Sequence, residues 1–276
     1  MAKSKATVLP GDRFIIKKDG HVAWLLFNRP DRLNAMTINS WAEFCGHLAA
    51  LDKDRAIRCL VIAGEGRSFL AGHDVGEIQE HNEQMVAGEL TAAQLREWQK
   101  NLQNSTRLIR AAHFPVIAAV HGYAVGAGCE LVFACDLVVA TRDAQFGFPE
   151  VNIGVTITNG GTFFMPRKIG LAKARELAYT GEFIGAEEAY RLGLVNRIAE
   201  GADVRKEAER LARRIASRAP VAVQLHKVML DAAQSSSLDG ALNFETEGLV
   251  MTAMTKDNLE GTRAFFEKRE PKFTGE

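Results

Sequence analysis

The sequence predicts an α/β protein whose last quarter is purely helical. Over about the first 200 residues, short apolar runs alternate with longer segments of helical periodicity, which is the pattern of strands separated by helices. From about Asp203 onward the strand-like runs stop, and only helical periodicity remains. With 47% hydrophobic and 25% charged residues, the chain has the composition of an ordinary globular protein. We therefore expect a core with the functional site at 1–200 and a helical assembly region at 201–276.

Strands are expected where an apolar run is bounded by turn residues. The first run, HVAWLLF, lies between a glycine and an Asn-Arg-Pro turn, and the second, CLVIA, ends in Gly-Glu-Gly. The run PVIAAV begins at a proline and is stopped by His-Gly. The segments expected to be strands are 21–27, 59–63, 115–120, 137–140 and 144–148.

Helices are expected between and after these runs. Thr37 can cap a helix whose apolar residues recur every three to four positions, and 77–112 is rich in polar helix formers. In the last part of the chain we expect helices at 203–218, 220–235, 238–253 and 257–267. These helices can cover their own domain or pack on a neighbouring subunit, and the pattern alone leaves both open.

The charge balance and the cysteines exclude several classes of protein. The 34 Lys and Arg residues equal the 34 Asp and Glu residues, which does not indicate a nucleic-acid or membrane-surface protein. Four scattered cysteines without a CxxC pair are typical of a reducing compartment. The N-terminal segment lacks the apolar stretch of a secretory signal, and no run of 18 apolar residues occurs. We expect a cytoplasmic protein with no membrane and no nucleic-acid partner.

Common catalytic motifs are missing from the sequence. It contains no GxxxxGK[ST], no GxSxG and no HExxH, so phosphate-loop, serine-hydrolase and zincin chemistry lack support. The seven histidines do not have the close spacing of metal ligands. No metal site is therefore expected.

Two glycine-rich turns and two glutamates remain as candidate functional elements. The turn LAGHD (70–74) and the turn GYAVGAGCE (122–130) each precede a helical segment, where free backbone N–H groups favour negative charge. Asp74 can cap the first of these helices. Glu130 and Glu150 lie in apolar surroundings, which suits general acid–base chemistry. Taken alone, either turn is better explained as a tight packing turn, and either glutamate as a solvent-facing side chain.

An ordered series of motifs resembles the enoyl-CoA hydratase/isomerase, or crotonase, superfamily over almost the whole chain. Each motif is weak by itself, but six in the same order are highly specific. They are NRPDRLNAM (28–36), CLVIAGEGRSFLAGHDVGEI (59–78), PVIAAVHGYAVGAGCELVFACDLVVAT (115–141), AQFGFPEVNIG (144–154), AYTGEFIGAEEAYRLGLVNRI (178–198) and EGTRAFFEKREPKF (260–273). The resemblance implies a crotonase (ClpP-like) ββα spiral with a C-terminal helical trimerisation region, and a homotrimer or a dimer of trimers. It also implies an acyl-CoA thioester substrate.

The resemblance implies catalytic roles for four residues. The backbone N–H groups of His73 and Ala127 would form an oxyanion hole for the thioester oxygen. Glu130 would activate water, and Glu150 would donate a proton to the α-carbon. The imidazole of His73 is expected to be a bystander. The implied activity is that of an enoyl-CoA hydratase, acting in either direction, as in fatty acid metabolism, with no metal or redox cofactor.

Further positions match those that bind the substrate in similar enzymes. The first group lines the pocket for the pantetheine and adenine, and the second approaches the coenzyme A of the same or a neighbouring subunit, with Lys268 as a phosphate partner. The first group is Leu33, Ala35, Ala71 and Val75, and the second is Phe265 and Lys268. A solvated side chain is an equal alternative for Lys268, and Asp74 and Gly76 are further positions expected to bind substrate.

The sequence departs from the family pattern in three places. An alanine stands between Gly126 and Gly128 where three glycines are common, and Gly76 replaces a frequent lysine. The segment ITNGGT (157–162) replaces PGAGGT, which changes the backbone options of a loop that shapes the acyl pocket. This departure favours an acyl group other than a simple short chain, such as an oxygenated, aromatic or cyclic one.

Other activities stay open at this level. Isomerase, lyase and hydrolase chemistry occur in similar enzymes, although an isomerase usually needs only one of the two glutamates. A non-catalytic acyl-CoA-binding protein and an RNA-binding protein are the alternatives from other classes. The two glutamates oppose the first alternative, and the absence of a concentrated basic helix opposes the second.

Overall fold

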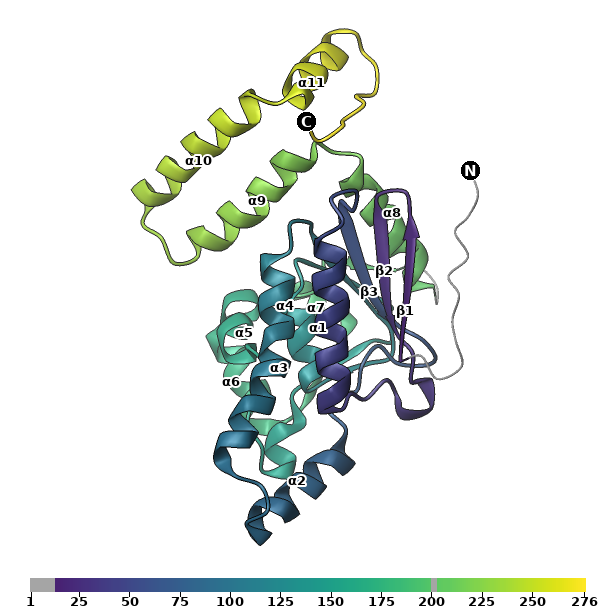
Figure 1. The fold of residues 1–276 in the computed structure, drawn as a ribbon, viewed down its shortest axis with the longest axis vertical. Helices are drawn as coiled ribbons and strands as arrows, with labels where there is room; N and C mark the ends of the chain where they lie inside the picture. Colours follow the sequence, from purple (N-terminus) through teal and green to yellow (C-terminus); the bar gives the residue numbers. More distant parts are fainter. Residues whose placement is uncertain (1–12, 200–202) are drawn as a thin grey trace.

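Two sheets form the centre of the computed structural model, which describes residues 13–199 and 203–276 (Figure 1). The larger sheet has the strand order β1-β2-β3-β4-β6-β9 and is parallel except for the β1–β2 hairpin. The smaller sheet has the order β5-β7-β8. The strands are β1 (Phe14–Asp19), β2 (Val22–Phe27), β3 (Cys59–Gly64), β4 (Val116–Val120), β5 (Tyr123–Val125), β6 (Leu137–Ala140), β7 (Gln145–Gly147), β8 (Phe183–Gly185) and β9 (Arg197–Ile198).

The helices fill the connections between strands and form the end of the chain. The α-helices are α1 (Ile38–Asp52), α2 (Val75–Ala87), α3 (Ala92–Ala111), α4 (Ala127–Ala134), α5 (Gly161–Ile169), α6 (Leu171–Thr180), α7 (Ala186–Arg191), α8 (Val204–Ala216), α9 (Pro220–Ala233), α10 (Leu238–Ala253) and α11 (Lys256–Phe266). Two short 3₁₀ helices, η1 (Pro30–Arg32) and η2 (Pro149–Ile153), begin at prolines. No helix in the described residues has the length and apolar character needed to cross a bilayer.

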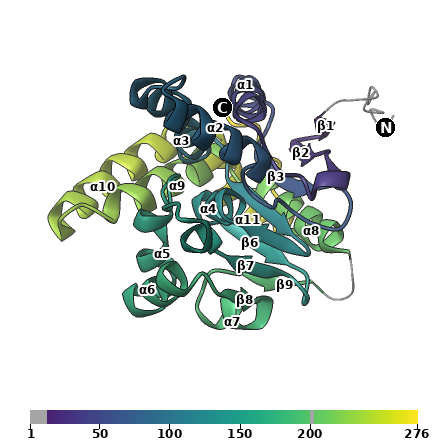
Figure 2. The same ribbon diagram turned by 90° about the horizontal axis from the view of Figure 1, so that it is seen from below.

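The large sheet is buried on both faces. Leu60 and Ile62 of β3 pack in a cluster with α1, α3 and α4, whereas Val61 and Ala63 point to the other face, which α8 covers (Figure 2). Every residue of β3 is buried, which explains why this strand reads as an unbroken apolar run. Because both faces are covered, the strand ends are left as the places where polar residues can gather.

The C-terminal helices α9–α11 stand at one end of the molecule, away from the sheet (Figure 1). One buried lysine ties α9 to the core: Lys227 Nζ lies 2.8 Å from Ile109 O, 2.9 Å from Phe114 O and 2.9 Å from Asp136 Oδ2. Helix α8 packs on the sheet, so within 201–276 only α9–α11 stand apart. The division at residue 200 otherwise stays a prediction.

Most expected elements are confirmed within one to three residues, including the capping of α1 by Thr37. Four strands were not expected. Strand β1 is an edge strand with exposed Lys18 and Asp19, and β5, β8 and β9 have only two or three residues each. Such strands are too short or too polar to stand out as apolar runs.

Candidate active site

The two glycine-rich turns meet because glycines allow their backbones to touch. Val125 N donates to Leu70 O at 3.0 Å, joining β5 to the first turn. Gly72 has a φ of +92°, and a Cβ placed on it would lie 2.6 Å from Val125 O and 3.3 Å from Ala127 N. A Cβ on Gly128 would lie 2.2 Å from Leu70 O. Both positions therefore require glycine.

This contact brings two main-chain donors into the same place. Ala127 is the first residue of α4, where a helix leaves its N–H groups without an intrahelical acceptor. The N–H of His73 follows Gly72 directly. Among the hydrogen bonds of residues 13–199 and 203–276, neither N–H has an acceptor. Two free donors from adjacent segments can hold one oxygen that gains negative charge.

Glu130 lies in the first turn of α4 and is 1% exposed. Its Oε1 accepts from Asn159 N at 2.5 Å and from Gly161 N at 3.0 Å, at the beginning of α5. Its Oε2 is buried and has no hydrogen-bond partner. Burial raises the pKa of Glu130 to about 7, although the loop amides act in the opposite direction.

Glu150 enters the site from η2, directly after β7. Parallel pairing of β5 with β7 sets Val125 opposite Gly147, so the segments that follow both strands emerge at the same edge of the small sheet. Glu150 Oε2 is buried and has no hydrogen-bond partner. Burial raises the pKa of this carboxyl as well. A Cβ on Gly126 would lie only 3.1 Å from Glu150 Oε1, so this side chain lies against the start of α4.

The fold thus brings together two carboxyl groups that are 20 residues apart in sequence. The charge of Glu150 contributes to the raised pKa of Glu130, as expected for neighbouring acidic groups in a buried site. Two such groups titrate as a pair and hold one proton over a range of pH. A pair with one proton could act as both a general base and a general acid, beside two N–H groups that could hold an oxyanion.

The His73 imidazole is engaged by an acidic side chain of α2. Its Nε2 lies 2.9 Å from Glu77 Oε2, which also accepts from Ile38 N at 2.8 Å. Burial lowers the pKa of His73, while the neighbouring Glu77 raises it. The bystander role of this ring stays a prediction. Through Glu77 of α2, its contacts link the first turn to the start of α1.

The residues expected to bind the pantetheine and adenine surround the first turn. Leu33 has a φ of +50°, and its carbonyl accepts from Ala71 N at 3.0 Å. Asp74 caps α2 as predicted, accepting from Gly76 N at 3.1 Å. Val75 is 61% exposed at the start of α2, and Ala35 lies in the segment between η1 and α1. These residues therefore lie on two segments, 33–35 and 71–76, which are joined by a hydrogen bond, and the second segment contains His73.

Phe265 and Lys268 are not part of this cluster within one chain. Phe265 lies in α11 and is 80% exposed, and Lys268 follows the helix with a φ of +55°. Figure 1 shows α11 and α2 at opposite ends of the molecule. Any contact of these two residues with substrate at the site would have to come from a neighbouring subunit.

The loop before α5 contributes groups that the sequence did not assign. Asn159 N and Gly161 N hold Glu130, and a Cβ on Gly161 would lie 3.2 Å from Glu130 Oε1. The family resemblance assigns the segment 157–162 only to the acyl pocket. Its Gly-Gly pair before a helical run is the signal that could have identified these donors, since free N–H groups at a helix start stabilise a carboxylate.

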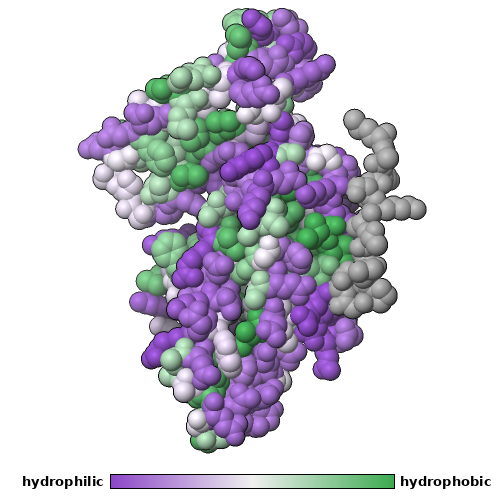
Figure 3. All heavy atoms as spheres, in the orientation of Figure 1, coloured by the Kyte–Doolittle hydropathy of each residue, from purple (hydrophilic) through white to green (hydrophobic). Residues whose placement is uncertain are grey.

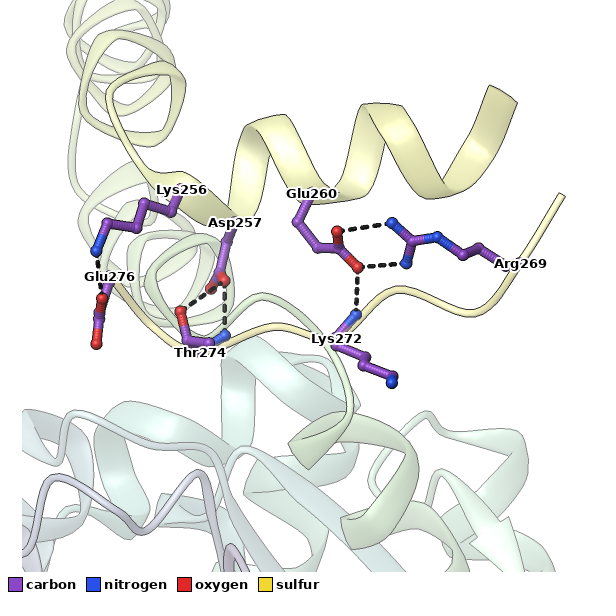
Figure 4. Close-up of a pocket in the computed structure, with 7 residues that line it drawn as sticks. All are labelled: Lys256, Asp257, Glu260, Arg269, Lys272, Thr274 and Glu276. Carbon is purple, nitrogen blue, oxygen red and sulfur yellow. Dashed lines mark hydrogen bonds and ion pairs between the residues drawn. The ribbon is translucent and has the colours of Figure 1, made fainter. Parts of the chain in front are cut away.

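A cavity of about 480 Å³ near the C-terminus is lined mainly by charged residues that pair with one another (Figure 4). Arg269 binds Glu260, Lys256 binds Glu276, and Asp257 accepts from Thr274 N at 2.7 Å. These contacts hold the end of the chain on α11. In the described part of the chain, no group of three or more His, Cys, Asp or Glu residues is placed to hold a metal ion.

The comparisons with known proteins agree with this geometry. Residues 17–276 match the family Enoyl-CoA hydratase/isomerase. The chain is 37% identical to crotonyl-CoA hydratase of Syntrophomonas wolfei, over 95% of this chain and 98% of that protein. It is 36% identical to short-chain-enoyl-CoA hydratase of Clostridium acetobutylicum, over 92% and 95%. The crystal structure of an enoyl-CoA hydratase from Polaromonas sp. JS666 superposes with a TM-score of 0.89 at 32% identity, covering 95% of this chain and 99% of that one. These findings confirm the resemblance and the crotonase fold, and the chain belongs to the Enoyl-CoA hydratase/isomerase family.

Proposed function

We propose that this chain hydrates an enoyl-CoA thioester with Glu130 and Glu150, and holds the thioester oxygen with the N–H groups of His73 and Ala127. One observation carries the proposal: Glu130 Oε2 and Glu150 Oε2 are buried, and neither has a hydrogen-bond partner among the described residues. Buried carboxyl oxygens without partners are costly, so they mark a place where water or substrate binds. Two free amide donors lie in the turns beside them.

The reaction balances with a single proton on the pair. Ionised Glu130 takes a proton from water as the water oxygen bonds to C3 of the substrate. The C2–C3 π electrons move toward the thioester, and the two N–H groups stabilise the negative charge that develops on its oxygen. Protonated Glu150 then delivers its proton to C2. Each proton transfer supplies about 10²–10⁴-fold in rate, and a proton exchange returns the pair to its starting state.

The proposal includes a homotrimer or a dimer of trimers. Apolar side chains gather on the surface of α9 and α10, where Figure 3 shows green areas. Such large exposed apolar side chains support burial against another subunit. Those exposed by more than half on α9–α11, or directly after α10 in the case of Met254, are Val228, Leu230, Leu238, Leu249, Met251, Met254, Leu259, Phe265 and Phe266. Native mass spectrometry tests this part, with three or six copies expected and a monomer contradicting it.

Assembly would allow Phe265 and Lys268 of one subunit to reach the coenzyme A bound by its neighbour. Lys268 would then pair with a phosphate of the substrate. We propose no metal or redox cofactor, since carboxyl groups and backbone dipoles suffice for the steps above. All four cysteines are free and buried, which supports a reducing, cytoplasmic location.

A screen of acyl-CoA thioesters with mass-spectrometric detection tests the proposed reaction. The expected result is a mass gain of one water. An unchanged mass with a moved double bond would show an isomerase, and cleavage would show a lyase or hydrolase. An isomerase usually needs only one carboxyl group, so the presence of both Glu130 and Glu150 favours the hydratase. The polar segment 157–162 supports testing oxygenated, aromatic and cyclic acyl groups beside simple ones.

A further inference from the structure

The loop that holds Glu130 has a second set of contacts on its other side, against α3. Gln99 Nε2 and Gln103 Nε2 each lie 3.1 Å from the same acceptor, Thr158 O. The two glutamines are four residues apart and therefore lie on one face of the helix. Both are partly buried and border a cavity of about 540 Å³ between α3 and the loop.

One peptide group links these glutamines to Glu130. The carbonyl of Thr158 and the N–H of Asn159 belong to the same trans peptide, in which the two bonds point in opposite directions. Because the glutamines hold the carbonyl toward α3, the N–H points away from α3. There it lies 2.5 Å from Glu130 Oε1. The direction of this donor is thus set by two side chains that do not touch the carboxyl group.

The next residue is fixed to α3 as well. The Asn159 side chain is 1% exposed, and its Nδ2 donates to Ser105 Oγ at 3.2 Å. Thr106 Oγ1 lies 3.0 Å from Asn159 O and 2.9 Å from Asn159 Oδ1. Polar contacts therefore hold both residues that flank the peptide group.

We propose that Gln99 and Gln103 are positioning residues for Glu130, which act together through the peptide group between Thr158 and Asn159. The proposal rests on the proposed function, because it gives the catalytic base its orientation. Each glutamine alone can hold the carbonyl, so the loss of one leaves a donor and the loss of both leaves none.

Few charged groups among the described residues act on Glu130, so a change in its pKa reports a change in the amide donor that it accepts from. Glu150 from η2 is the acidic group whose charge acts on it. The neighbouring thiol of Cys129 stays neutral, because burial raises its pKa well above the usual value. The α3 residues that face the loop are uncharged, except that Arg107 donates to Gln103 Oε1 at 3.3 Å. A shift in the Glu130 titration on loss of the glutamines would therefore report the amide donor.

The experiment compares Gln99→Met, Gln103→Met and the double variant, since methionine keeps the length and the helix propensity of glutamine. Infrared difference spectra against Glu130→Gln follow the Glu130 carboxyl through pH, and hydration kinetics are measured in parallel. We expect the double variant to raise the Glu130 pKa by on the order of one unit. It should also lower kcat about tenfold with KM within about twofold, and each single variant should change little.

The matched control is the double variant Gln79→Met and Gln84→Met on α2, whose side chains donate to Glu83 and Glu80. If the α3 double variant does not fold, Gln99→Leu with Gln103→Leu, which removes the same two donors and keeps helix propensity, takes its place with the same expected direction. An unmoved Glu130 titration in the folded variant overturns the proposal, as do equal and additive losses from the single variants. If the Glu130 titration shifts in the double variant but the wild type hydrates no thioester, the positioning role is supported and the proposed function is refuted.

Discussion

The region around Glu130 supplies hydrogen-bond donors to its carboxyl group, whereas the region around Glu150 buries its carboxyl without a donor from another described residue. Glu130 Oε1 accepts two main-chain N–H groups at the start of α5, and the loop is held in turn by α3. Glu150 lies in a short 3₁₀ helix against Gly126, with a buried and unpartnered Oε2. Two glutamates of one site thus lie in different electrostatic surroundings.

This difference shows how one fold can make a base and an acid from the same side chain. Amide donors stabilise a carboxylate and fix its direction, which suits the group that must take a proton from water. Burial without such donors also raises the pKa of Glu150, which suits a group proposed to give a proton to carbon. Burial raises both pKa values, and in Glu130 it outweighs the donors. We therefore expect the two groups to share one proton over a range of pH.

The largest effect is expected from removing either carboxyl group. We expect Glu130→Gln and Glu150→Gln each to lower kcat by about 10²–10⁴-fold, because each removes one of the two proton transfers. Steady-state hydration of crotonyl-CoA measures this loss. Glu97→Gln is the matched control, since Glu97 is exposed and pairs only with Lys100. Wild-type rates in both site variants would refute the assignment.

The next effect concerns the oxyanion donors that lie beside the carboxyl pair. In Gly72→Ala, the new Cβ would meet Val125 O at 2.6 Å and push the turn away from Ala127. We expect kcat to fall roughly 100-fold or more, as when one oxyanion donor is lost. Gly88→Ala is the control, because Gly88 also has a positive φ of +76° but has nothing within 4 Å of the new Cβ. It should lower stability by about 1 kcal/mol and keep the activity. Equal kcat losses in both variants would contradict the account.

The pH dependence tests whether the pair shares one proton. The reactive form has Glu130 ionised and Glu150 protonated, so activity should need one proton on the pair. We expect a bell-shaped profile of kcat/KM. Its alkaline limb should lie near pH 7, where the second proton leaves, and its acid limb above the ordinary pKa of 4.5 for glutamic acid. A profile that is flat from pH 5 to about 9 would show that the pair does not carry the reaction.

A smaller effect concerns stability and distinguishes the two regions directly. The pKa of Glu130 is raised from 4.5 to about 7 in the folded state, so the folded state binds more protons over this range. Stability is therefore lost as pH rises through the range, by on the order of 3 kcal/mol. We expect Glu130→Gln to be more stable than the wild type at pH 8 and similar at pH 4.5, in urea unfolding. Glu150→Gln should show a smaller gain, because Glu150 is less buried. A larger gain from Glu150→Gln would reverse the comparison.

The sequence predicted the parts of the fold that depend on local pattern. The buried strand β3 and the helix after Thr37 have clear periodicity and turn residues, and both are confirmed. The edge strand β1 has a polar end, and β9 has two residues, so neither forms a recognisable run. The sequence also named Glu130 and Glu150, but their proximity depends on the pairing of β5 with β7.

The Gly-Gly pair can mark free N–H groups before α5, but the local pattern could not predict the contacts by which they hold Glu130. These contacts join Asn159 N and Gly161 N to a side chain about 30 residues earlier in the chain, and the loop's other side to Gln99 on α3. Main-chain donors carry no residue-type signature, since every residue except proline has one. In the sequence, the two glutamines are typical of the polar face of a helix. The fold shows that they donate to the carbonyl of Thr158.

The most direct test of the paired carboxyl groups is the hydration of crotonyl-CoA in heavy water, followed by mass spectrometry for the wild type and Glu150→Gln. The account predicts that the wild-type product gains one water and one deuterium fixed at C2, and that Glu150→Gln forms this product about 10²–10⁴-fold more slowly. A wild-type product of unchanged composition with a shifted double bond would contradict the account. So would a Glu150→Gln variant that labels C2 at the wild-type rate.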